Sequence, residues 1–150
     1  MALLAVFATS CGDDGGGGAD AALAAQNCST DERAPTFELG LSESGSAGYT
    51  VTVSQSSPFP VARDDNDWTV TITDGDGQPA TGLSVTTDPQ MPDHGHGTPI
   101  RAEITEGNPG TYEISRINLW MPGYWEIGFA LADDQGGAVD TLMFRVCVDP

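Results

Sequence analysis

Apolar and polar residues alternate with a period of two in several short stretches of the chain. The clearest are residues 49–54, 68–73, 124–131 and 140–148, in which every second residue is aliphatic or aromatic. Threonine and aromatic residues are frequent in these stretches, and both types favour strands. Alternation of this kind is typical of antiparallel strands that place one face on a core and the other in water.

Turn-forming residues separate these stretches. The segments "DGDGQPATG", "EGNPG", "MPG" and "DDQGG" all stand between alternating runs, and Gly, Pro, Asn and Asp favour tight connections. About seven strands at a spacing near ten residues predict an all-β, immunoglobulin-like antiparallel β-sandwich. We expect Trp125 in its core, and Trp120, whose place in the alternation is irregular, at the end of a loop.

The N-terminal residues predict export from the cell. An apolar run at residues 2–8 precedes Cys11 and a Gly/Ala/Asp-rich segment, as in a bacterial lipoprotein signal peptide whose cysteine becomes lipidated. Residues 1–10 are the predicted signal peptide, residues 11–33 the lipidated cysteine with a flexible linker, and residues 34–150 the folded domain. The run is shorter than the roughly 20 residues that span a bilayer, so we expect attachment to the periplasmic or cell-surface face of a membrane through lipid alone. The alternative is a mildly apolar leader without lipid.

Charge and missing motifs exclude several classes of function. The chain has 5 basic residues, 22 acidic ones and a formal charge of -17, which repels nucleic acid phosphates and anionic lipid surfaces. The sequence has no Gly-x-Ser-x-Gly motif and no glycine-rich phosphate loop between a strand and a helix. We therefore expect a binding protein and no catalytic activity.

The two remaining cysteines predict a disulfide bond. Cys28 precedes the domain and Cys147 lies close to its end, and an isolated pair in an exported protein is most simply a disulfide. Such a bond closes a loop of about 120 residues and stabilises the fold by roughly 4 to 5 kcal/mol in the chain-entropy model. The alternative is a pair of buried thiols or soft metal ligands.

Both histidines of the chain lie in the segment "MPDHGHGT", residues 91–98. On an extended backbone, His94 and His96 point to the same side, close enough for one ion. Met91 offers a thioether from the same loop, and Met121 offers another if the sandwich brings the two connections to one end. Imidazole with thioether suits copper, and methionine favours its cuprous state. The alternative is that the histidines fix the shape of the loop through hydrogen bonds to backbone or to Asp93.

Four segments together resemble a known family. "MPDHGHGT", "GTYEI", "LWMPGYWEI" and "DTLMFRV" are similar to the YtkA-like domain, a relative of FixH, over roughly residues 65 to 148. The resemblance implies an immunoglobulin-like sandwich outside the cytoplasmic membrane, often in a lipoprotein, and FixH relatives are implied in assembling copper-containing terminal oxidases. Its motif positions are those of Met91, His94, His96 and Met121, so it implies these four residues as metal ligands.

Two functions follow from these observations. The first is a membrane-anchored, non-catalytic module that binds copper through Met91, His94, His96 and Met121, with a copper ion or a copper-handling envelope protein as its partner. The second is a structural or protein-interaction module in which the His-Gly-His loop is architectural. A metal-dependent gain in stability separates the first function from the second.

Overall fold

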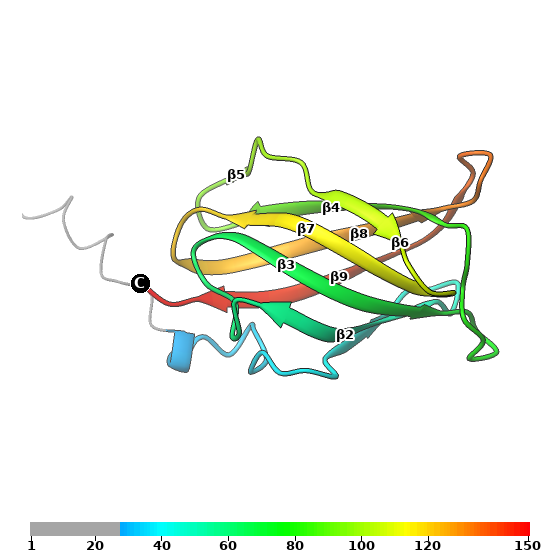
Figure 1. The fold of residues 1–150 in the computed structure, drawn as a ribbon. Helices are drawn as coiled ribbons and strands as arrows, with labels where there is room; N and C mark the ends of the chain where they lie inside the picture. The colour runs from blue at the N-terminus through cyan, green and yellow to red at the C-terminus, as the bar shows by residue number, and fades with distance from the viewer. Residues whose placement is uncertain (1–27) are drawn as a thin grey trace, which may run out of the picture.

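Two antiparallel β-sheets pack face to face in the computed structural model, which describes residues 28–150 (Figure 1). The five-stranded sheet has the order β1-β2-β3-β7-β6 and contains β1 (Ser42–Ser44), β2 (Thr50–Ser57), β3 (Asp64–Thr73), β6 (Glu103–Glu106) and β7 (Thr111–Leu119). The four-stranded sheet has the order β5-β4-β8-β9 and contains β4 (Ser84–Met91), β5 (His96–Gly97), β8 (Gly123–Ala132) and β9 (Ala138–Val148). A 3-10 turn, η2 (Cys28–Thr30), precedes the strands.

The predicted all-β sandwich is confirmed. The alternating stretches form β2, β3, β8 and β9, and the inward residues of each strand are buried while most of their neighbours are more exposed. The structure has two more strands in residues 28–150 than the expected number of about seven. Its two shortest strands, β1 and β5, have three and two residues and lie at sheet edges. Strands this short leave no readable alternation in the sequence.

An aromatic cluster joins the two sheets in the core. The ring of Trp68 on β3 stacks at 5.4 Å from Phe37 and 6.4 Å from Phe129, and it meets the edge of Phe144 at 5.7 Å. Offset-stacked and edge-to-face arrangements at these separations are favourable beyond the area that they bury. Trp125 is also fully buried, as predicted, and Trp120 is exposed.

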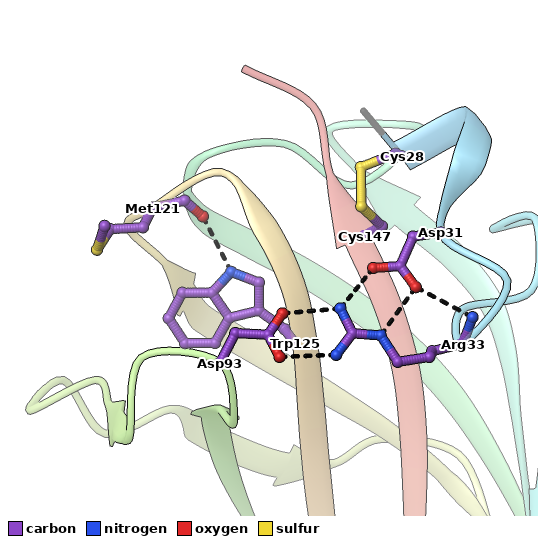
Figure 2. Close-up of a disulfide and its surroundings, with 7 residues drawn as sticks. All are labelled: Cys28, Asp31, Arg33, Asp93, Met121, Trp125 and Cys147. Atoms are coloured by element: carbon purple, nitrogen blue, oxygen red, sulfur yellow. Dashed lines mark hydrogen bonds and ion pairs between the residues drawn. A yellow bond between two sulfur atoms is a disulfide. The ribbon is translucent and has the colours of Figure 1, made fainter. Parts of the chain in front are cut away.

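The predicted disulfide between Cys28 and Cys147 is present. Cys147 lies opposite Tyr124 in the β8–β9 ladder, on the outer face of the four-stranded sheet, because the adjacent pair Trp125 and Val146 points into the core. The bond therefore holds residues 28–33, here called the strap, against that outer face (Figure 2). Cys11 and the predicted signal peptide lie outside the described residues. Within residues 28–150, no helix has the length and hydropathy required to cross a membrane.

Candidate metal centre

The His-Gly-His segment forms the tip of a short hairpin between β4 and β5. The strands make two ladder pairs, and the amides of His94 and Gly95 both donate to the carbonyl of Met91, at 3.1 and 2.9 Å. Gly95 has a φ of +67°, a conformation in which glycine is much less strained than other residues. At Gly97, a Cβ atom would stand 2.5 Å from the carbonyl oxygen of Pro89. The glycines on both sides of His96 are thus required by the shape of the hairpin.

The two imidazoles lie side by side at this tip. Their ring centres are 5.6 Å apart with an interplanar angle of 51°, and His94 is exposed while His96 is half-buried. The His96 ring stacks on the indole of Trp120 at 5.2 Å. Its Nδ1 lies 3.4 Å from the carbonyl oxygen of Gly97. Because a carbonyl oxygen only accepts, this contact is a hydrogen bond only when Nδ1 carries the proton. In that tautomer Nε2 carries the lone pair, so it is the nitrogen that could bind a metal ion.

The strand register brings Met91 next to His96. The two residues are direct partners in the β4–β5 ladder, and directly opposed residues of antiparallel strands point to the same face of the sheet. Met91 is 0% exposed and packs in the core, whereas His96 is half-buried. The thioether is therefore out of contact with water, on the strand position that pairs with His96.

Met121 lies in the connection between β7 and β8, next to Trp120. The stacking of Trp120 on His96 shows that this connection and the β4–β5 hairpin meet at the same end of the sandwich. Met121 is partly buried against the core, and its carbonyl accepts a hydrogen bond of 2.9 Å from the indole nitrogen of Trp125 (Figure 2). The structure thus gathers His94, His96 and Met91 around one hairpin, with Met121 on the adjoining connection.

Arg33, on the strap, contacts the same hairpin through Asp93. Its two terminal nitrogens each donate to one oxygen of Asp93 at 2.7 Å, and its side chain also makes two hydrogen bonds to Asp31 (Figure 2). The guanidinium carbon stands 4.1 Å from the centre of the Tyr124 ring. No pattern in the sequence indicates this cluster, because Arg33 and Asp93 are 60 residues apart and Arg33 falls in the predicted linker.

The cluster shifts the pKa of its members in the directions that ion pairing and burial require. Hydrogen bonds from the Arg33 side chain hold the pKa of Asp31 below its ordinary value of 3.8. The hydrogen bonds to Asp93 and then to Asp31 raise the pKa of Arg33 above its ordinary range. Burial is the largest cause of the raised pKa of Tyr124. All three shifts favour the ionised pair and the neutral phenol, so the cluster keeps one charge state at neutral pH.

The contribution of Asp31 to stability is expected to vanish in acid. Because its folded-state pKa lies below 3.8, its stabilisation is complete above that value and is lost as the pH falls further, through the folded-state pKa. The difference in free energy of unfolding between the wild type and Asp31→Asn should therefore be constant from pH 5 to 7 and decline below about pH 4. Urea unfolding at a series of pH values measures it, and a difference that grew in acid would contradict the assignment.

Among residues 28–150, no three His, Cys, Asp or Glu side chains gather as a metal-binding group. Methionine lies outside that set of ligands. The hairpin thus contributes two neighbouring imidazoles, and the buried Met91 is the cross-strand partner of one of them.

Comparisons with known proteins place the chain in a family. No curated protein matches it. Among solved structures, a copper-bound variant of the Campylobacter jejuni P19 protein has a TM-score of 0.48 and 11% identity, covering 76% of this chain and 98% of that one. A copper-bound variant of FetP from uropathogenic Escherichia coli has a TM-score of 0.46 and 8% identity, covering 72% and 98%. The YtkA-like family model matches residues 43–130, more than half of the chain, so the protein belongs to the YtkA-like family.

Proposed function

We propose that this protein is an exported, non-enzymatic copper-binding protein whose site is the hairpin that carries His94 and His96. The observation that supports it most is the separation of 5.6 Å between the two imidazole centres. An ion about 2.0 Å from one nitrogen of each ring stands about 3.2 Å from each ring centre, so one ion allows centre separations up to about 6.4 Å. The separation of the two rings is therefore within the limit that one shared ion allows.

The methionines favour copper over harder ions. Thioether sulfur is a soft ligand that selects cuprous copper, and imidazole binds copper in both common oxidation states. Met91 is the cross-strand partner of His96, so an ion on the inner side of that imidazole would approach the buried sulfur. Met121 is the further thioether of the proposed ligand set, from the connection that Trp120 joins to the hairpin.

The cellular setting is part of the proposal. The bond between Cys28 and Cys147 supports an oxidising compartment, since disulfides are rare in the cytosol. We assign Cys11 as the lipid-modified residue, which holds the domain at the periplasmic or outer face of a bacterial membrane. The partner is a copper ion or a copper-handling protein of the same compartment.

Copper titration tests the site directly. The full chain is titrated with Cu(I) and with Cu(II) against a competing chelator, alongside a His94→Ala/His96→Ala double variant. We expect the double variant to lose at least about 100-fold in affinity, since it removes two ligands where the loss of one outer-shell contact already costs 10- to 100-fold. Equal affinity of the two proteins, or wild-type binding no tighter than that of a generic acidic protein, would refute the proposal.

A matched pair of methionine variants tests whether the sulfur of Met91 is a copper ligand. Met91→Leu conserves volume in the core, and Met143→Leu makes the same change at an exposed position on β9. Weaker Cu(I) binding in Met91→Leu alone assigns its sulfur as a ligand, whereas equal binding in both leaves the imidazoles as the ligands. Met121→Leu, compared with Met143→Leu in the same way, tests whether the sulfur of Met121 is a ligand.

The architectural function makes a different prediction for the histidine double variant. If the histidines serve only the shape of the loop, the double variant loses the same stability with and without copper. If they bind copper, wild-type protein at 100 times its dissociation constant gains about 2.7 kcal/mol that the variant lacks. Thermal unfolding with and without added copper distinguishes the two.

A further inference from the structure

The strap crosses the end of the four-stranded sheet from one edge toward the other. It begins at Cys28, bonded to Cys147 on the edge strand β9. It passes over Tyr124 on β8, which is only 3% exposed although it lies outside the main core cluster. It reaches Asp93 in the β4–β5 hairpin through Arg33. The strap thus connects the disulfide to the hairpin that carries the two histidines (Figure 2).

The guanidinium of Arg33 is fixed from the strap side before it meets the hairpin. The backbone amide of Arg33 and its Nε donate to one oxygen of Asp31, at 3.0 and 2.9 Å, and a terminal nitrogen donates to the other at 2.7 Å. The Tyr124 ring lies against the guanidinium face, a cation–π arrangement. These contacts leave the guanidinium pre-oriented for the two parallel hydrogen bonds to Asp93.

The Arg33–Asp93 pair is closer than the ion pairs made by Arg116 and Arg145. Arg116 lies 3.6 to 3.7 Å from its two carboxylates, and Arg145 lies 3.8 Å from Glu126. Isolated pairs at such distances on an exposed surface contribute little. Arg33 instead makes two contacts of 2.7 Å with Asp93, and bidentate charge-assisted bonds are the strong and directional ones.

The hairpin itself has little else in its backbone to fix its orientation. It contains two ladder pairs at a sheet edge and the two turn hydrogen bonds to the Met91 carbonyl. Outside these, the Gly97 carbonyl accepts a long bond of 3.5 Å from the Trp120 indole nitrogen, on the side where that ring stacks on His96. Asp93 precedes His94 directly, so a displacement of the Asp93 backbone displaces the backbone of His94 as well. From these contacts we infer that Arg33 is a positioning residue for His94 and His96, which transmits the constraint of the Cys28–Cys147 bond to the hairpin.

One consequence concerns the loop and another concerns the metal. Without the two hydrogen bonds from Arg33 to Asp93, the hairpin should open more often. The sandwich should stay folded, since its core does not contain Arg33. The effect on copper rests on the proposed function: a site whose imidazoles are not held in place binds more weakly, because ordering them then costs free energy at the moment of binding.

Hydrogen exchange of the metal-free full-length protein tests the positioning role without reference to copper. The variants are Arg33→Gln, Asp93→Asn and Cys28→Ser/Cys147→Ser. Arg116→Gln is the matched control, since its arginine has similar exposure (48% against 45%) and two acidic partners on the other sheet. We expect exchange at the His94 and Gly95 amides to accelerate about fivefold in the first three variants and to stay unchanged in the control. A change of about fivefold corresponds to the upper end of the strengths measured for surface ion pairs.

Two further results decide the role. The Arg33→Gln/Asp93→Asn double variant should exchange no faster than either single variant, because both remove the same interaction. Arg33→Lys should retain more protection than Arg33→Gln but less than the wild type, since an ammonium cannot donate two parallel hydrogen bonds to one carboxylate. Exchange in Arg33→Gln equal to that in Arg116→Gln would overturn the inference, whether or not the cysteine variant folds.

Chelator competition with copper forms the second arm. Arg33→Gln should bind copper more weakly than Arg116→Gln, although neither arginine is a ligand. If the wild type binds no copper, the proposed function fails, and the exchange results still decide the positioning role by themselves. If the wild type binds copper and Arg33→Gln exchanges faster yet binds equally well, the link from the strap to the metal site is overturned.

Discussion

Removal of the Cys28–Cys147 bond is expected to lower the free energy of unfolding by about 4 to 5 kcal/mol. The two cysteines are 119 residues apart in the sequence, so the bond closes almost the whole described chain into one loop. Without the bond, the unfolded chain has a higher conformational entropy, which favours unfolding. The measurement is urea unfolding of Cys28→Ala/Cys147→Ala against the parent protein, both carrying Cys11→Ser so that no third thiol exchanges with the pair.

The cysteine variant loses stability from two sources, the opened loop and any weakened contacts of the strap, and a second variant separates them. Arg33→Gln with the disulfide intact removes the contacts of the strap but keeps the loop closed, so it should cost far less than the cysteine variant. A rise in the m-value of the cysteine variant is expected as well, because its unfolded chain exposes more surface. A loss below about 1 kcal/mol would show that the chain-entropy account does not hold for this protein.

Truncation of Trp68 to alanine is the second large effect, with an expected loss of about 3 to 5 kcal/mol. Trp68 is 1% exposed and its ring contacts Phe37, Phe129 and Phe144. The alanine variant loses the transfer free energy of the indole and leaves a cavity between the two sheets that the surrounding rings only partly fill. Urea or thermal unfolding monitored by circular dichroism measures the loss.

The chain provides its own controls for this change. Trp120→Ala makes the same substitution at a residue that is 39% exposed, and it should cost much less stability while altering the environment of His96. Trp125→Phe should cost more than Trp68→Phe, because the first leaves the Met121 carbonyl without its indole donor. The indole nitrogen of Trp68 has no hydrogen-bond partner among the described residues. The reverse order would contradict the packing described for the two sheets.

The sequence predicts the fold well because its signals are local and periodic. Alternation over six to nine residues identifies β3, β8 and β9, since burial of one face forces a period of two. The disulfide is predictable for a different reason: an exported chain with two remaining cysteines has one simple pairing. The hairpin of His94 and His96 is predictable as a segment, because glycine and proline mark its turn.

The contacts around that hairpin could not be predicted, because they depend on how the sheets are ordered. Trp120 meets His96 only because β7 and β4 belong to different sheets whose connections end on the same side. The pairing of Met91 with His96 depends on a register of two ladder pairs, which no alternation specifies. Arg33 meets Asp93 across 60 residues, between two segments without periodic pattern. Side-chain pairs between loops leave no signature in the sequence of either loop.

The two ends of the sandwich differ in what they carry. The strap, the C-terminus, the His94–His96 hairpin and the β7–β8 connection lie at one end, and the β3–β4 and β8–β9 connections lie at the other (Figure 1). Because the described chain enters at Cys28, any tether upstream of it attaches at the histidine end. The point of attachment therefore lies on the same side of the domain as the two histidines, and the β8–β9 connection lies at the far end. A partner that docks on the hairpin therefore meets the domain beside its point of attachment, whereas a partner that docks on the β8–β9 connection meets it at the opposite end.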